Sequence, residues 1–189
     1  MDAFARVDLP SGSTVVLIGI GGVPILVLQF ACARGARVII TSSFDEKIAR
    51  TRALGADDGV NDRSRPDWGV AVHELTGGLG ADLVQESAGA ETYPRSIAAV
   101  HHGGTVFTIG VLSGSEAKLD LRAVMNTEIP IQGNHIGPVA NLRDAMAAAA
   151  AARIAPVIDP TYPVDQIAEA HAHVAGGGHF GKVTVTLDW

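Results

Sequence analysis

A glycine-rich stretch near the amino terminus has the residue types and spacing best suited to a chemical task. Residues 19–24 read GIGGVP, between an apolar strand-like run and an apolar helix-like run. In a strand–turn–helix unit with the pattern G-x-G-x-x-G, the glycines let backbone N–H groups approach a dinucleotide pyrophosphate. Pro24 departs from the pattern, but the first turn of a helix accepts proline. We expect a phosphate-binding turn; the alternative is a glycine-rich turn without a ligand.

The segments that must position this turn alternate between short β-branched runs and helix-like runs. The expected strands are residues 14–18, 37–41, 58–61, 81–86, 105–109, 129–133 and 182–187. The expected helices are residues 24–34, 43–54, 68–76, 92–100, 141–153 and 164–174. This alternation predicts an α/β fold of the Rossmann type, a doubly wound, mostly parallel sheet in three α/β/α layers. We expect residues 1–152 to form the dinucleotide-binding domain and residues 153–189 a distinct tail.

The composition is that of a globular protein, and its charge excludes some partners. The chain has 47% hydrophobic and 18% charged residues and a net charge of −6. An acidic chain is not expected to bind nucleic acid or an anionic membrane, since both require basic patches. The most apolar stretch, residues 22–33, is shorter than the roughly 20 residues that span a bilayer.

Cysteine usage and the first residues bear on the cellular compartment. Cys32 is the single cysteine, so no internal disulfide can form, and a reducing compartment is expected. The first six residues, MDAFAR, lack the basic region and apolar run of a signal peptide. Together these features predict a cytoplasmic protein.

No group of side chains has the pattern of a catalytic or metal site. Tyr93 and Tyr162 have no lysine four positions on, which excludes the Tyr-x-x-x-Lys pair of short-chain reductases. No G-x-S-x-G nucleophile turn is present. The histidines His101-His102 and His171-x-His173 lack the spacing of metal ligands.

Three side chains are expected near the edge of the sheet where ligands bind. Glu86 and Ser87 lie at the end of one predicted strand, and His135 follows another. Parallel α/β sheets bind ligands at the carboxyl ends of their strands. None of the three is a convincing general acid or base, so we assign no catalytic residue and no metal ligand.

The end of the second predicted strand bears on the choice between NAD and NADP. It reads Thr41-Ser42-Ser43, where an NAD site would carry an acid about 20 residues after the first glycine to bind the ribose 2′-hydroxyl. Hydroxyl groups with Lys47 nearby suit a 2′-phosphate instead. We therefore expect NADP(H) to be preferred over NAD(H). The alternative for Lys47 is a solvated surface position.

Longer stretches resemble the cofactor-binding half of the medium-chain dehydrogenase/reductase superfamily, the group of zinc-type alcohol dehydrogenases and quinone oxidoreductases. The similar stretches are GSTVVLIGIGGV (12–23), LQFACARGARVIITSS (28–43), DEKIARTRALGADDGVN (45–61), ELTGGLGADLVQESAG (74–89), GGTVFTIGVLSG (103–114) and HFGKVTV (179–185). They run in order over almost the whole chain, so together they are more specific than the glycine turn alone.

The resemblance implies three groups of cofactor contacts. The pyrophosphate would contact Gly19, Gly21, Gly22, Val23 and Pro24. The adenosine ribose would face Thr41, Ser42, Ser43 and Lys47. The nicotinamide end would lie near Ser87, Gly89, Ile109, Gly110 and Val111. The chain departs from the family at Asn61-Asp62-Arg63, where an aromatic residue is common, and at Pro138-Val139, where a polar pair is common.

The resemblance also implies that one of the two domains of the family enzymes is absent from this sequence. Family enzymes carry a β-rich domain before this one, with the catalytic zinc, where present, and most of the substrate pocket. By this resemblance, the sequence would start at the second domain and is expected to bind no zinc, and its tail resembles the segment that packs on the first domain. In the complete enzyme, hydride would pass between NADP(H) and a small-molecule alcohol, carbonyl, enone or quinone. The chain alone is expected to be inactive.

Partners and alternative functions follow from the same comparison. Family cofactor domains often join their sheets near the sixth strand, so a homodimer through Ile129–Gly133 is expected. A non-enzymatic NADP(H)-binding or scaffold module is the main alternative function, favoured by Pro24 and the absent domain. An S-adenosylmethionine site is a weaker alternative, because it would usually need an acid at the end of the second strand.

Overall fold

The computed structural model describes residues 4 and 6–187 and contains a six-stranded sheet of order β3-β2-β1-β4-β5-β6. Its strands are β1 (Thr14–Ile18), β2 (Arg37–Ser42), β3 (Asp58–Asn61), β4 (Ala81–Glu86), β5 (Val100–Thr108) and β6 (Ile131–Gly133). All five strand pairings are parallel. This order is that of a doubly wound Rossmann sheet, so the predicted fold class is confirmed. Part of the segment MDAFAR, on which the expected lack of a signal peptide rests, lies outside the described residues.

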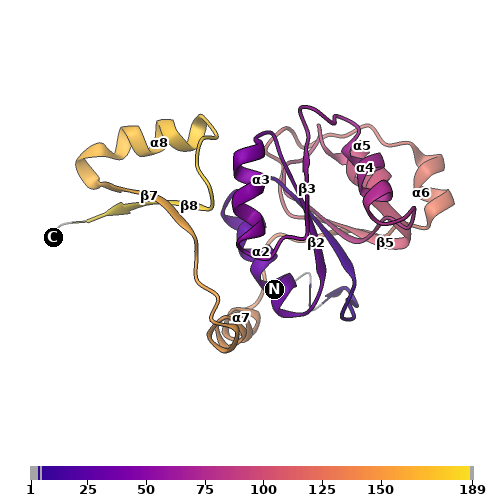
Figure 1. The fold of residues 1–189 in the computed structure, drawn as a ribbon, viewed down its shortest axis with the longest axis horizontal. Helices are drawn as coiled ribbons and strands as arrows, with labels where there is room; N and C mark the ends of the chain where they lie inside the picture. The colour runs from indigo at the N-terminus through magenta and orange to yellow at the C-terminus, as the bar shows by residue number, and fades with distance from the viewer. Residues whose placement is uncertain (1–3, 5, 188–189) are drawn as a thin grey trace.

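Strand β1 shows why both faces of the sheet are buried. Val15 and Leu17 belong to one hydrophobic cluster and Val16 and Ile18 to another, because successive side chains of a strand point to opposite faces. Helices α2 (Gly22–Ala33) and α7 (Val139–Ala152) contribute side chains to the first cluster. The second cluster includes side chains of α4 (Trp68–Leu75), α5 (Tyr93–Ala99) and α6 (Leu121–Thr127). Figure 1 shows α4 and α5 on one side of the sheet and α2 and α3 (Asp45–Arg52) on the other.

Two elements were not expected from the sequence, and β5 begins five residues earlier than expected. Helix α6 begins after Asp120, whose carboxylate accepts a hydrogen bond from the Arg122 amide at 2.9 Å. Strand β7 (Ile158–Pro163) contains two prolines, which obscure a strand pattern. Strand β5 begins at Val100 rather than at residue 105, because it pairs with Ala81 before an irregularity in the register.

The tail forms a small unit beyond α3. Strands β7 and β8 (Lys182–Thr186) pair in parallel, and α8 (Ile167–Ala175) connects them after a short 3-10 helix (Val164–Gln166). Figure 1 shows this unit extending away from the six-stranded sheet. Arg50 joins it to α3 through an ion pair with Asp159 at 2.9 Å. The predicted domain boundary after residue 152 stays a prediction.

One buried side chain in β4 has no hydrogen-bond partner. Gln85 is 1% exposed, and neither polar atom of its amide is paired among the described residues. Burying an unpaired amide destabilises the fold. We expect Gln85→Met, which has similar volume and no amide, to raise the free energy of unfolding by about 1–2 kcal/mol. Urea denaturation measures this, with Gln132→Met in the half-buried β6 position as control; a lower stability for Gln85→Met would contradict the expectation.

Candidate cofactor site

The glycine turn connects β1 to α2 in the geometry that the sequence predicts. Gly19 has a φ of 78°, in the left-handed region that favours glycine, and its amide donates to the Thr41 hydroxyl at 3.3 Å. Gly21 is the N-cap residue of α2, and its carbonyl accepts from the Ile25 amide at 3.2 Å. Pro24 lies in the first helical turn, where no intrahelical donor is lost. The turn therefore leaves the amino terminus of α2 facing the carboxyl end of the sheet.

A cavity of about 490 Å³ opens at the carboxyl end of the sheet, beside the glycine turn. Eight of the residues predicted to contact a cofactor line it: Gly19, Gly21, Gly22, Val23, Pro24, Ser87, Ile109 and Gly110. Polar residues that the sequence analysis did not assign also line it, among them Asp62, His179 and Lys182. The phosphate-binding turn and the expected nicotinamide end thus border one cavity.

The residues expected at the adenosine ribose do not line this cavity. Thr41 is fully buried beneath the glycine turn, and Ser42 is 4% exposed, with its hydroxyl accepting from the Phe44 amide at 3.3 Å. Ser43 donates to the Asp62 carboxylate at 2.7 Å, and Asp62 does line the cavity. Contact of these hydroxyl groups with a ribose stays a prediction.

Lys47 contacts the tail. Its side chain is buried, and its ammonium donates to the carbonyl of Gly177 at 2.6 Å and to that of His179 at 3.2 Å. The same ammonium lies 4.7 Å from the centre of the Phe44 ring. The surface position weighed as an alternative for Lys47 is therefore wrong, because the ammonium fastens the tail to α3. A 2′-phosphate contact stays a prediction.

The tail closes one side of the cavity. The Gly181 amide donates to the Ile20 carbonyl at 3.0 Å, and Gly181 forms a parallel bridge with Gly21. The Lys182 side chain crosses Gly22 so closely that a β-carbon there would lie 2.2 Å from Cε of the lysine. The stretch HFGK at 179–182 was matched by resemblance, but no local pattern in it indicates a contact with a turn so far away in sequence.

His179 also faces the glycine turn. Its Nε2 lies 4.0 Å from the position that a β-carbon on Gly21 would occupy. Its Nδ1 is buried and has no hydrogen-bond partner among the described residues. Burial lowers the pKa of His179 from its usual value of 6.5, and Lys47, His173 and Lys182 lower it further, against an opposing effect of Asp159.

The loops at the expected nicotinamide end are fixed by a buried carboxylate. Glu86 is fully buried and accepts hydrogen bonds from the loop that follows β4. Ser87 donates to the Ile18 carbonyl at 3.1 Å, which ties β4 to β1. Gly89 and Val111 line a neighbouring cavity of about 270 Å³. His135 is exposed and lines neither of these cavities.

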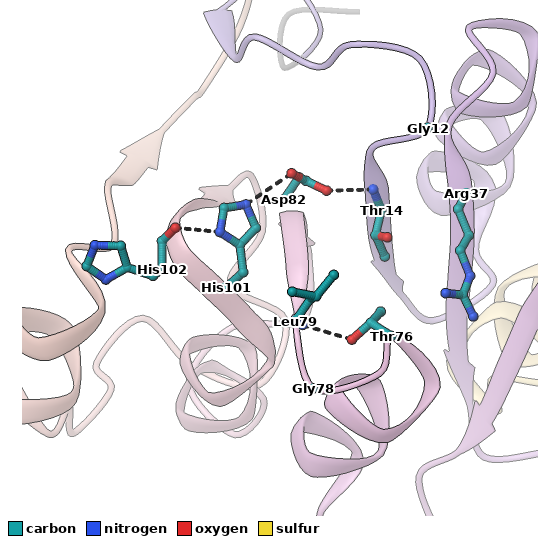
Figure 2. A pocket seen from close by; sticks show the side chains of 10 residues that line it. Gly12, Thr14, Arg37, Thr76, Gly78, Leu79, Asp82, His101 and His102 are labelled. Atoms are coloured by element: carbon teal, nitrogen blue, oxygen red, sulfur yellow. Dashed lines mark hydrogen bonds and ion pairs between the residues drawn. The ribbon is translucent and has the colours of Figure 1, made fainter.

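Another cavity, of about 580 Å³, lies at the opposite end of the strands, their amino end (Figure 2). The Asp82 carboxylate accepts from the Thr14 amide at 2.7 Å and contacts His101 Nε2 at 3.0 Å. Arg37 donates to Asp58 at 2.7 Å and to the Leu75 carbonyl at 2.8 Å. These polar groups bond to one another at the amino ends of the strands, whereas α/β sheets bind ligands at the carboxyl ends.

The described part of the chain has neither a metal-binding cluster nor a membrane-spanning helix. Within residues 4 and 6–187, no three His, Cys, Asp or Glu side chains are grouped so that they could hold a metal ion. No helix in these ranges combines the length and the apolar character needed to cross a membrane.

The strand order, the glycine turn and the cavity at the carboxyl end of β1 define a domain of the Rossmann class. A comparison with protein families is more specific. Residues 22–151 match the family described as zinc-binding dehydrogenase, and the chain belongs to that family.

Individual relatives are similar over nearly the whole chain. A zinc-type alcohol dehydrogenase-like protein of Schizosaccharomyces pombe is 35% identical over an alignment of 181 positions that covers 94% of this chain and 52% of the relative. A crotonyl-CoA reductase of Streptomyces collinus is 29% identical over an alignment of 195 positions that covers 94% of this chain and 43% of the relative. The solved structure of a candidate alcohol dehydrogenase from Sinorhizobium meliloti 1021 has a TM-score of 0.88 at 40% identity and matches 95% of this chain and 52% of that one. The chain thus spans about half the length of these relatives.

Proposed function

We propose that this chain binds a nicotinamide dinucleotide in the 490 Å³ cavity and forms the cofactor-binding half of an oxidoreductase. The observation that carries the proposal is that one cavity is lined by the glycine turn and by the ends of β4 and β5. The amino terminus of α2 and the ammonium of Lys182 provide positive charge for the pyrophosphate. Ser87 and Gly110 would lie at the nicotinamide end. The bound nicotinamide would accept or donate hydride.

The substrate class follows from the relatives. Those named alcohol dehydrogenase and crotonyl-CoA reductase support hydride transfer to or from a small-molecule alcohol, carbonyl, enone or quinone. They favour an enzyme over a non-enzymatic scaffold. The substrate pocket would come from the half of the relatives' length that this chain does not span, and the chain alone would be inactive.

Two cations beside the Phe44 ring support a preference for NADP(H). The Arg63 guanidinium lies 4.6 Å and the Lys47 ammonium 4.7 Å from the centre of the Phe44 ring, next to Ser43 in the chain. Two cations at this position would favour a 2′-phosphate. Asp62 is the observation that favours NAD(H) instead, because its carboxylate bonds to Ser43 and would suit a ribose hydroxyl.

Calorimetric titration of the full chain with NADPH, NADH and S-adenosylmethionine tests the proposal. We expect NADPH to bind about tenfold more tightly than NADH, a difference of about 1.4 kcal/mol, and S-adenosylmethionine not to bind. Ser43→Asp adds a charge that repels a 2′-phosphate, so it should weaken NADPH binding at least about tenfold and affect NADH little. Ser64→Asp places the same charge on an exposed neighbouring loop and is the matched control. Equal or tighter binding of NADH would contradict the preference, and binding of neither dinucleotide would contradict the function.

We also propose a homodimer and a cytoplasmic location. Strand β6 is the edge strand of the sheet, and Ile131 in it is 42% exposed. Edge strands offer unpaired backbone groups to a second chain. Leu121 and Met125 on α6 are also exposed, which gives this part of the chain more apolar surface. The single cysteine, Cys32, supports the location.

A further inference from the structure

His179 combines three properties that no role in the fold explains. It lines the cofactor cavity, its Nε2 faces Gly21 of the glycine turn, and its Nδ1 is buried without a partner among the described residues. Buried polar atoms are nearly always hydrogen-bonded. No described residue fixes this ring in place through Nδ1, and Nε2 is the ring nitrogen that faces the turn. Neighbouring His173, in contrast, bonds through Nδ1 to the Tyr162 hydroxyl at 2.8 Å.

The charges around His179 come from four elements. Lys47 on α3, His173 on α8 and Lys182 on β8 disfavour an imidazolium, whereas Asp159 on β7 favours it. Burial and the three basic groups lower the pKa of His179 from its usual value, which disfavours the imidazolium when no cofactor is bound. Asp62, which lines the same cavity, bonds to Ser43.

We propose that His179 is a ligand of the dinucleotide pyrophosphate and that it takes up a proton from solvent when the cofactor binds. The inference rests on the proposed function and specifies how the same cavity is regulated. A pyrophosphate on the glycine turn would bring two negative charges next to Nε2 and to the Lys182 ammonium. An opposite charge within about 4–6 Å stabilises an imidazolium, and the resulting N–H···O bond is charge-assisted.

Proton uptake makes cofactor affinity depend on pH in a defined direction. The pKa of His179 is low in the free chain and is raised by the bound anion. Between these two pKa values, the complex holds more protons than the free chain, so the dissociation constant rises with pH by up to about tenfold per unit. Below the lower pKa and above the higher pKa, this dependence disappears.

Calorimetry of the full chain with NADPH at pH 7, in PIPES, HEPES and Tris buffers of different ionisation enthalpy, counts the protons. We expect the parent chain to take up a large fraction of one proton for each NADPH bound. His179→Gln keeps an N–H donor but cannot titrate, so it should bind NADPH within about tenfold of the parent and lose the uptake. His171→Gln changes an exposed histidine of α8 and should retain the proton uptake.

The outcomes separate this inference from the proposed function. NADPH binding with no proton uptake in the parent chain would overturn the role of His179 and leave the cofactor site intact. Uptake that persists in His179→Gln would assign the proton to another group, such as His173, and would overturn it equally. Absence of NADPH binding by the parent chain would overturn the proposed function and the inference with it.

Discussion

Replacing Glu86 by alanine is expected to lower the free energy of unfolding by about 4 kcal/mol, because several buried donors would lose their acceptor. One carboxylate oxygen accepts from the amides of Ala88 and Gly89 at 2.8 and 2.9 Å and from the Thr92 hydroxyl at 2.8 Å. The other oxygen accepts from the Ser96 hydroxyl. Glu86 is 0% exposed, so water cannot readily replace these bonds.

Guanidinium denaturation of the 189-residue chain measures this loss. Glu86→Gln keeps one oxygen acceptor and should lose only about half as much stability. Glu91→Ala removes an exposed carboxylate five residues away and should change stability by less than about 0.5 kcal/mol. A Glu86→Ala chain as stable as Glu91→Ala would show that the carboxylate does not hold this loop.

Replacing Gly110 by alanine is expected to weaken NADPH binding by at least about tenfold. The new β-carbon would lie 2.0 Å from the Ser87 carbonyl oxygen and 2.7 Å from its carbonyl carbon. Because both atoms are backbone, the segments after β4 and β5 would have to separate at the end of the cavity they line. Overpacking of this kind typically costs about 1–3 kcal/mol of stability as well.

Titration of NADPH into folded variants tests the effect on binding, and thermal unfolding tests the effect on stability. Gly133→Ala is the matched control, since a β-carbon at Gly133 meets no atom within 4 Å. Its affinity and stability should stay close to those of the parent chain. If Gly110→Ala bound NADPH as tightly as Gly133→Ala, the cofactor would not reach the ends of β4 and β5.

Local sequence patterns were sufficient to predict the sheet. The β-branched run from Thr14 to Ile18, the glycine turn and the helix after it form one unit, and repeats of that unit permit few topologies. The missed elements lack such patterns: β7 contains two prolines, and α6 is a helix of 7 residues with Asp120 as its only clear signal.

The candidate site was predicted only in part, because its remaining walls come from contacts distant in sequence. The Lys47 ammonium bonds to Gly177, 130 residues away, and its expected contact with a ribose stays a prediction. The Thr41 hydroxyl accepts from the Gly19 amide, a contact across 22 residues that the sequence pattern did not indicate. Such contacts leave no periodic pattern in the sequence. The cavity-lining positions of His179 and Lys182 therefore required the structure.

The tail that fastens to Lys47 also sets an order of events during synthesis. All six strands of the main sheet precede Asn134, so the sheet can form on the nascent chain before residues 177–182 leave the ribosome. At about 5–20 residues per second, residue 177 follows Gly133, the last residue of β6, by a few seconds. During that interval the nascent protein would have a folded sheet and an uncovered glycine turn. The cofactor cavity would be completed only by this late segment.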